Sequence, residues 1–473
     1  MSQPSTNGGT DTLRYRLDSS WRRPNNGNTV IAGSPLRLFR LTDSGAQFIA
    51  DVEADVAISP TPAHQQLLDR FVDAGALHPV PRAGPFSIAD VTIVVPAHNR
   101  LPTWTAAQTI VVDDGSNPPL AHATVRHASN RGPGAARNTG LAEVTTPLVA
   151  FVDTDVLLCD DWLTPLLAHF ADDRVALVAP RVASAPGATS LAGYEQRHSP
   201  LDLGGEPARV APGTRVAYVP AAAIVCRTDA VRELSGFDER LRTGEDVDLV
   251  WRLCAAGHRC RYEPNSIVFH APRASIAALV EQRFGFGRSA TPLAARHPGA
   301  LAPVRMNVWS AVVWALALAR RPWLALGVLA GTIVALHRKL NEKRHDKPHD
   351  KLHDLPLVES ARLAGLGTLG AGRQLADATA SVWWPITAAL AAVSRRRRLP
   401  IAVALIAPAA AAAMRQRSAQ PLVDWPVQLL DRMAYGAGVW AGAVSARDFA
   451  ALTPKISAHS AQTDSGTRPQ RIN

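Results

Sequence analysis

The chain has 473 residues, of which 47% are hydrophobic and 19% charged, and a formal net charge of +10 at pH 7. This composition excludes wholesale disorder, and the length predicts two or three domains. Part of the positive charge lies in the run Arg395 to Arg398 beside apolar segments, which indicates a membrane surface. No interleaved aromatic and basic platform is present, so nucleic acid is not an expected partner.

The four cysteines form no CxxC pair and have no histidine partners at zinc-finger spacing. They are predicted to be buried reduced thiols, so the part of the chain that carries them is expected to face the cytoplasm. Residues 1–11 are polar and predicted to be disordered, and they lack the basic and apolar regions of a cleavable secretion signal.

The segment 12–81 is predicted to be a small α+β domain. Two strand-like stretches, 29–31 and 36–41, alternate in the way a half-buried hairpin does. A helix that carries Phe48 follows, and then an amphipathic helix over 65–74.

This order of elements, with the phrase Leu-Thr-Asp-Ser-Gly-Ala at 41–46, resembles the PqqD-like domains of peptide-modifying pathways. The resemblance implies a winged-helix-like domain that recognises a peptide. A packing domain without a ligand is the alternative interpretation. Residues 79–85, rich in Pro and Gly, are predicted to be a linker.

From Asp90 to about residue 298, strands alternate with helical segments, which predicts a three-layer α/β domain. The predicted strands are 91–96, 110–112, 148–152, 175–178 and 221–225, and the predicted helices are 134–141, 162–170, 229–234 and 246–255.

The region 302–455 is predicted to be an apolar helical region that associates with a membrane. Its first two apolar stretches are each shorter than the ~20 residues that a spanning helix needs. A helical hairpin in one leaflet, two short tilted spans and a soluble helical bundle therefore all remain open. The charged, histidine-rich stretch 339–353 is predicted to be a solvated loop, and 456–473 a disordered tail.

Candidate nucleotide-sugar residues begin at two successive strand ends. The phrase 94–100 contains Pro96 and Asn99, and the next strand ends in Asp113-Asp114-Gly. Ligands of open α/β sheets bind at the carboxyl ends of strands, where either aspartate can accept a hydrogen bond from a uracil or a ribose. A simple Asp-Gly turn is the alternative.

The stretch 130–140 reads Asn-Arg-Gly-Pro-Gly-Ala-Ala-Arg-Asn-Thr-Gly. Gly132 at a helix start offers backbone amides, and Arg131 and Arg137 offer guanidinium groups, to a diphosphate, with Asn138 beside them. An ordinary glycine-rich helix start is the competing interpretation.

The phrase Phe-Val-Asp-Thr-Asp-Val at 151–156 carries the candidate metal ligands. Residues i and i+2 of an extended segment point alike, so Asp153 and Asp155 can face one Mg²⁺ or Mn²⁺ ion. Such an ion can neutralise the charge that grows on a departing nucleotide diphosphate, so Asp153 also counts as a donor-binding residue. Taken alone, the pattern also fits a solvated strand end.

In this order, the motifs resemble those of inverting family 2 glycosyltransferases of the GT-A fold, over roughly 90–298. A further match, Gly-Glu-Asp-Val-Asp at 244–248, implies that Asp246 is the general base and that Glu245 assists it. Two acids that serve only the helix dipole are the alternative.

The peptide-domain pattern, the catalytic motifs and the phrase at 284–299 together resemble the glycosyltransferases of mycofactocin systems. That resemblance implies an α/β GT-A domain between a winged-helix-like domain and an apolar helical region. It also implies transfer of glucose from UDP-glucose, in β linkage, onto a peptide-derived acceptor. Two alternatives stay open: a catalytically impaired protein that binds peptide and recruits it to a membrane, and a transferase acting on a lipid or polysaccharide.

Two departures from the family pattern stand out. Only ten residues separate Asn99 from Ile110, whereas a parallel crossover with its helix needs about a dozen or more. The first helix of the domain is therefore predicted to be missing or severely shortened. In addition, Gln282 is followed by Arg-Phe-Gly-Phe rather than by the Gln-x-x-Arg-Trp pattern of processive relatives, so processive transfer is not predicted.

Overall fold

The computed structural model describes residues 14–80, 84–341 and 355–457. It divides into two compact units, a first unit up to Ile276 and a second unit from Ala277 onward. The tail predicted at 1–11 and most of the loop predicted at 339–353 lie outside the described residues. The tail predicted at 456–473 also lies outside them, apart from its first two residues, which belong to a strand.

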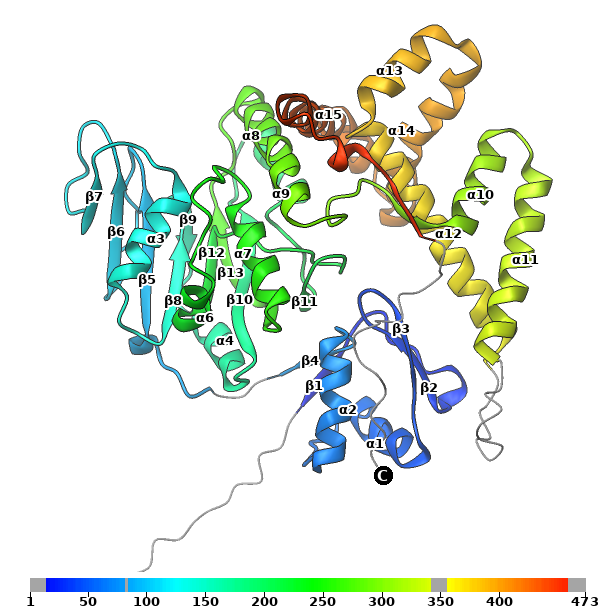
Figure 1. Cartoon of the computed structure of the whole chain (residues 1–473), viewed down its shortest axis with the longest axis horizontal. Helices are drawn as coiled ribbons and strands as arrows, with labels where there is room; N and C mark the ends of the chain where they lie inside the picture. Colours follow the sequence, from blue (N-terminus) through cyan, green and yellow to red (C-terminus); the bar gives the residue numbers. More distant parts are fainter. Residues whose placement is uncertain (1–13, 81–83, 342–354, 458–473) are drawn as a thin grey trace, which may run out of the picture. The chain divides into compact units, whose positions relative to one another are not determined.

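The N-terminal part of the first unit contains the predicted hairpin and both predicted helices (Figure 1). The second helix begins three residues earlier than predicted, because the Thr61 hydroxyl accepts a hydrogen bond from the His64 amide at 3.3 Å and caps it. Its elements are β1 (Tyr15–Leu17), β2 (Thr29–Ala32), β3 (Arg37–Arg40), α1 (Asp43–Glu53), α2 (Pro62–Asp73) and β4 (Leu77–Pro79), with β1 paired to β4 and β2 to β3.

The rest of the first unit is built on a nine-stranded mixed sheet in the order β11-β13-β10-β12-β8-β5-β6-β7, with β9 paired to β13. Strand β12 is antiparallel to both of its neighbours, while β10–β13 and the run β8-β5-β6-β7 are parallel. The strands are β5 (Val91–Ala97), β6 (Thr109–Asp114), β7 (Val125–His127), β8 (Leu148–Val152), β9 (Val156–Leu158), β10 (Val175–Ser184), β11 (Ala208–Val210), β12 (Ala223–Arg227) and β13 (Arg259–His270).

All five predicted strands are present, because each is a short apolar run that the sheet buries. Four strands were not predicted. Strand β13 is the longest of the sheet, yet its sequence contains arginines, a glutamate and a proline, so it does not look like a buried strand. Strands β7, β9 and β11 have three residues each, too few for a periodic pattern.

Helices α3, α6 and α7 lie where helices were predicted, whereas only the middle of the helix predicted over 162–170 is α-helical. There the short helix α4 is followed by a 3-10 turn (η3, Ala168–Ala171), and α4 starts late because Pro165 suits only a first helical turn. The helices are α3 (Pro133–Glu143), α4 (Thr164–Leu167), α5 (Ser190–His198), α6 (Thr228–Glu233) and α7 (Glu245–Ala255).

No helix lies in the described connection between β5 and β6, as the short spacing predicted. The two strands are nevertheless parallel neighbours, with Ile93 opposite Thr109. The connecting segment is anchored by Trp104, whose indole N–H donates to the Val156 carbonyl at 2.9 Å and whose ring packs on the sheet core. Trp104 therefore fixes this connection to the sheet in the segment where the family pattern predicts a first helix.

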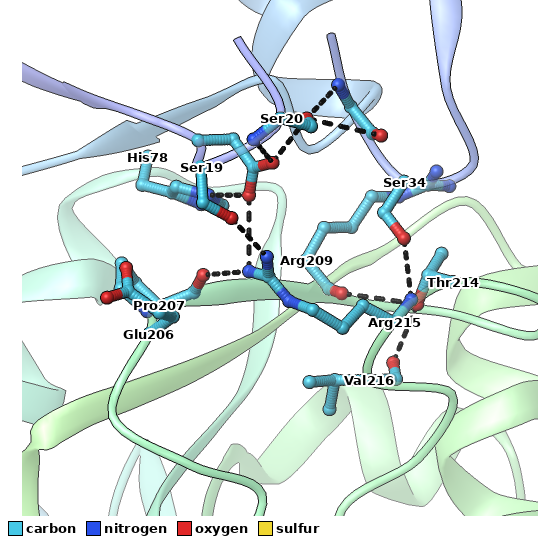
Figure 2. A network of polar contacts seen from close by, with 12 residues as sticks. Ser19, Ser20, Ser34, His78, Glu206, Pro207, Arg209, Thr214, Arg215 and Val216 are labelled. Carbon is cyan, nitrogen blue, oxygen red and sulfur yellow. Dashed lines mark hydrogen bonds and ion pairs between the residues drawn. The ribbon is translucent and has the colours of Figure 1, made fainter. Parts of the chain in front are cut away.

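Charged contacts join the N-terminal part to the sheet part within the first unit. Figure 2 shows Arg215, whose guanidinium donates to the Ser19 hydroxyl at 3.0 Å and to the Pro207 carbonyl at 2.9 Å. The same guanidinium forms a 3.1 Å ion pair with Asp18. Asp18 also accepts a 3.0 Å hydrogen bond from buried His78. Polar contacts of Arg215, one of them an ion pair with the buried Asp18, therefore join the N-terminal part to the sheet part.

The second unit is helical. Helices α11 and α14 are long and apolar enough to cross a membrane by length and composition, and only 6% of each apolar window is buried within the protein. The apolar stretch at 323–336 therefore belongs to a longer helix than the sequence predicted. The elements are α8 (Ile276–Arg288), α9 (Ala290–Arg296), β14 (Arg305–Asn307), α10 (Val308–Leu318), α11 (Pro322–Asn341), α12 (Leu357–Ala380), α13 (Trp384–Val393), α14 (Arg395–Gln416), α15 (Gln420–Ala446) and β15 (Lys455–Ser457).

Candidate active site

Three of the sequence motifs meet at the buried side chain of Arg137 on α3. Its Nη1 donates to Glu245 Oε1 at 2.6 Å, and its Nη2 donates to Asp153 Oδ1 at 2.7 Å. The guanidinium also lies over the Phe237 ring, 5.3 Å from the ring centroid. The glycine-rich helix start, the Asp-x-Asp strand end and the acidic helix start are therefore one cluster.

The two aspartates of the Asp-x-Asp phrase engage different partners. Asp153, which follows β8, forms an ion pair with Arg137 at 2.7 Å. Asp155 lies 2.9 Å from His270 Nε2 and 3.8 Å from Arg273 Nη2. Their side chains are one-third and one-quarter exposed, at 33% and 26%. Both carboxylates can therefore be reached from outside the protein core.

The surroundings of the two aspartates shift their pKa values in opposite directions. Burial and the neighbouring Asp155 carboxylate raise the pKa of Asp153 even though Arg137 opposes the rise. Burial also acts to raise the pKa of Asp155, but the hydrogen bond from His270 and the charges of His270 and Arg273 outweigh it and lower the pKa. Two carboxylates that repel each other in this way gain from a shared positive charge.

The donor set fits a divalent cation in chemistry, since carboxylates suit Mg²⁺ and Mn²⁺, and imidazole suits first-row transition metals. With the side chains as they stand, no three Asp, Glu, His or Cys residues of the described chain are grouped to hold an ion. His270 is a candidate ligand that sequence reasoning missed, because β13, the strand that brings it to Asp155, was not predicted.

The acidic pair at the start of α7 splits into a buried and a half-buried carboxylate. Glu245 is 6% exposed, and burial and the charge of Asp246 raise its pKa to about 7, although Arg137 acts to lower it. Asp246 is half-buried and accepts hydrogen bonds from the backbone amides of Ala221 at 3.1 Å and Val247 at 2.8 Å. Asp246 is the more accessible acid of the two.

The predicted donor residues Asp113 and Asp114 are buried at the end of β6 and bonded within the chain. Asp113 accepts from the backbone amides of Ser116 at 2.9 Å and Leu120 at 3.1 Å. A direct contact of Asp113 with a uracil or ribose stays a prediction.

Asp114 links the first motif to the second. Its carboxylate accepts from the backbone amides of Arg131 and Gly132, each at 2.8 Å, and from His127 at 2.7 Å. Gly132 has a φ of +99° there, which an L side chain rarely adopts. In this structure Asp114 therefore orients the glycine-rich loop at the start of α3.

Asn138 has both of its amide groups bonded to the turn that follows α6. Its Nδ2 donates to the Phe237 carbonyl and its Oδ1 accepts from the Phe237 amide, both at 2.8 Å. The turn needs glycine at Gly236, where φ is +67° and an added Cβ would clash with Asn138. Asn138 thereby places Phe237 under Arg137, and its predicted role in donor binding is untested.

The remaining predicted donor residues lie outside the Arg137 cluster. Arg131 is half-exposed and pairs with Glu239 at 2.7 Å. Asn99 is exposed, and its backbone amide donates to the Ser116 hydroxyl at 2.8 Å. Pro96 lies in β5 opposite Val112 and is half-buried.

Comparison with known proteins gives three findings. The model of the family described as "Glycosyl transferase family 2" matches residues 92–234. The chain is 37% identical to the pre-mycofactocin glycosyltransferase of Mycobacterium tuberculosis over 477 residues, 94% of this chain and 98% of the relative. It is also 32% identical to the succinoglycan biosynthesis protein ExoA of Rhizobium meliloti over 122 residues, 21% of this chain and 37% of that protein.

Among solved structures, the mannosyltransferase PcManGT from Pyrobaculum calidifontis, in complex with GDP-Man and Mn²⁺, is similar over 74% of this chain and 89% of that one. The sequence identity of the pair is 16% and the TM-score is 0.34.

Proposed function

The chain belongs to the pre-mycofactocin glycosyltransferases, whose catalytic domain here is a family 2 domain of the GT-A fold, and we propose that it transfers glucose from UDP-glucose onto a peptide-derived acceptor. The product is a β-glycoside formed with inversion at the anomeric carbon. The observation that carries this proposal is the bridge from Asp153 through Arg137 to Glu245, since it joins a donor-side acid to an acceptor-side acid.

The donor diphosphate lies at the start of α3. Gly132 is the N-cap of that helix, whose dipole favours an anion, and Arg131 directly precedes it in the chain. Asp114 keeps the loop in place through two backbone amides. The proposed donor site also includes four residues that support the neighbouring turns, namely Pro96, Asn99, Asp113 and Asn138.

Asp246 is the proposed general base. It takes the proton from the acceptor hydroxyl as the hydroxyl oxygen attacks the anomeric carbon and the bond from that carbon to the diphosphate oxygen breaks. The products are the glycoside, protonated Asp246 and UDP. Glu245 assists through Arg137, because its carboxylate holds the guanidinium that also positions Asp153.

Asp153 and Asp155 are the proposed ligands of a Mn²⁺ or Mg²⁺ ion, with His270 as a third. When bound, such an ion supplies positive charge to the leaving diphosphate. The Asp155 carboxylate and the His270 imidazole lie 2.9 Å apart, so an ion held by both would replace their direct contact.

We place the N-terminal part, 12–81, as a PqqD-like domain that holds the acceptor, 90–298 as the transferase domain and 302–455 as a membrane-associated region. Helices α11 and α14 support the last role, since Trp323 is 83% exposed and Leu399 is 70% exposed. Exposed Arg395 to Arg398 beside them suit anionic headgroups on the cytoplasmic side of the cell membrane.

Mass spectrometry tests the function directly. The full chain is incubated with UDP-glucose, Mn²⁺ and the peptide-derived acceptor, and increments of one hexose are followed. We expect transfer by the parent protein and a large loss in Asp155→Ala. Absence of transfer, with parent and variant indistinguishable, contradicts the proposal.

The missing helix between β5 and β6 favours a second candidate, a protein that binds the peptide at a membrane without transferring sugar. Calorimetric titration with UDP and Mn²⁺ separates the two, because only the transferase gives a saturable, metal-dependent signal. A transferase acting on a lipid or polysaccharide is distinguished by deleting 1–81, which would then leave its activity unchanged.

A further inference from the structure

Two of the four cysteines are not buried, in contrast to the prediction from the sequence. Cys159 is exposed and Cys254 is half-buried, whereas Cys226 and Cys260 are buried. Cys254 lies in the last turn of α7, and Cys260 is the second residue of β13. The chain reverses between them at Gly257, which has a φ of +90° and whose amide donates to the Cys254 carbonyl at 3.1 Å. This turn sets the end of α7 beside the start of β13.

The thiols of Cys254 and Cys260 meet near the Val210 carbonyl on β11. Cys254 Sγ donates a hydrogen bond to this oxygen at 3.3 Å, and Val210 lies directly opposite Cys260 in the antiparallel pairing of β11 with β13. Directly opposite residues of such a pair have Cα atoms only ~4.5–5.5 Å apart. A hydrogen bond between the two thiols lowers the pKa of Cys254 and raises that of Cys260. The two cysteines are therefore a contacting pair of thiols.

Small molecules have room to reach this pair. Cys254 and Cys260 both line a cavity of about 140 Å³ in the first unit. A water molecule takes up ~30 Å³ in the liquid, so hydrogen peroxide or another small hydroperoxide fits this space. Arg209 also lines the cavity, and its charge lowers the pKa of Cys254 further, while burial opposes the shift. A partly exposed thiol beside a positive charge has the surroundings of a reactive cysteine.

We propose that Cys254 and Cys260 are a redox modification site, which a small hydroperoxide oxidises to a disulfide. The Cys254 thiolate attacks one peroxide oxygen and the O–O bond breaks. The departing oxygen takes up a proton and leaves as an alcohol, or as water when the oxidant is hydrogen peroxide, and Cys254 becomes a sulfenic acid. Cys260 then loses its proton as its sulfur attacks the sulfur of Cys254, and the S–O bond breaks with release of water.

The net reaction oxidises two thiols to one disulfide and reduces one hydroperoxide. The disulfide ties the last turn of α7, the helix whose first turn carries Asp246, to β13. A small thiol such as dithiothreitol reduces it again by thiol–disulfide exchange, so the modification is reversible.

Mass spectrometry of the full chain tests the site. Cys159→Ser first removes the exposed thiol that would crosslink two molecules. This protein is treated with hydrogen peroxide in metal-free buffer, unfolded in excess N-ethylmaleimide and digested with trypsin. We expect a linked pair of peptides that carries Cys254 and Cys260 and that dithiothreitol separates.

Cys226 is the reference thiol within the same chain, because burial raises its pKa and it does not line the cavity. Free Cys254 should disappear roughly tenfold or more faster than free Cys226, since each unit of pKa changes the thiolate fraction about tenfold. Cys226→Ser should leave the linked peptides unchanged.

Cys260→Ser removes the thiol that completes the disulfide. Cys254 should then stop at the sulfenic acid, which dimedone captures. If this variant fails to fold, the peptide map of the Cys159→Ser protein still decides. Oxidation of Cys254 no faster than that of Cys226, or oxidation of Cys254 without a bond to Cys260, overturns the proposal.

Discussion

The guanidinium of Arg137 and the carboxylate of Asp153 lie 2.7 Å apart, where the start of α3 meets the end of β8. The same guanidinium holds Glu245, so the donor side and the acceptor side of the candidate site share one buried cation. Its Nε has no hydrogen-bond partner among the described residues, which leaves the Asp153 and Glu245 bonds as its main stabilising contacts.

Replacing Arg137 should destabilise the protein. Breaking a buried ion pair typically costs ~3–5 kcal/mol, because the partner charge stays buried. Arg137 also acts to lower the pKa of Glu245, which is about 7, so its removal raises that pKa further. The loss of stability in Arg137→Met should therefore grow as the pH rises above 7. Urea unfolding at pH 6 and pH 8 measures it; Arg131→Met, which breaks a half-exposed pair, is the control, and equal small losses in both would refute this role.

Asp246→Asn should abolish most of the activity while leaving the fold intact. General-base catalysis contributes roughly 10²–10⁴-fold, and the half-buried Asp246 accepts backbone hydrogen bonds that an asparagine oxygen can still accept in part. Steady-state kinetics should show a fall in kcat with UDP binding retained. Asp229→Asn changes an acid in the first turn of α6 instead, and it should be silent. If the Asp246→Asn enzyme kept its activity, a residue other than Asp246 would be the general base.

His270→Ala should raise the Mn²⁺ concentration needed for half-maximal activity roughly 10- to 100-fold, the range found when groups that support a metal site are removed. The reason is that the imidazole of His270 lies 2.9 Å from the carboxylate of Asp155 and is the proposed third ligand. A metal titration of activity measures the shift. The exposed His122→Ala is the matched control, and identical titration curves for both variants would exclude His270 as a ligand.

The buried His78 should make the first unit sensitive to mild acid. Burial lowers its pKa below the ordinary 6.5, although the hydrogen bond to Asp18 opposes the shift. The unfolded chain therefore binds a proton at a higher pH than the folded chain. Stability is then complete above 6.5 and falls as the pH drops from 6.5 toward the lowered value. Melting temperatures of the parent and His78→Asn between pH 8 and pH 5 should diverge below 6.5, and parallel curves would contradict the prediction.

Replacing Arg395 to Arg398 with glutamine should weaken binding to anionic vesicles by roughly 1 kcal/mol for each arginine that lies near the headgroups. Cosedimentation of the full chain with vesicles containing phosphatidylserine measures the loss, and vesicles of phosphatidylcholine alone provide the baseline. If the protein binds both kinds of vesicle equally before and after the change, the arginines do not contact lipid.

Much of the fold could be predicted, because local sequence carries the relevant physics. The apolar runs at 91–96 and 148–152 are buried strands, and the acids at 245–248 begin a helix, as short-range patterns indicate. The short spacing from Asn99 to Ile110 likewise predicted a connection without a helix. Strand β13 could not be predicted, since its burial comes from pairing with β10, β11 and β9 rather than from an apolar sequence.

For the site, the sequence by itself determined which residue types are present and in what order, because Asp-x-Asp, the glycine-rich stretch and Glu-Asp are local phrases. Only the tertiary structure decided which of them meet. Arg137 reaches a residue 108 positions away at Glu245, and Arg209 opposes Arg261 only because β11 pairs with β13. Contacts between residues distant in sequence depend on strand pairing and helix packing, which no local periodicity encodes.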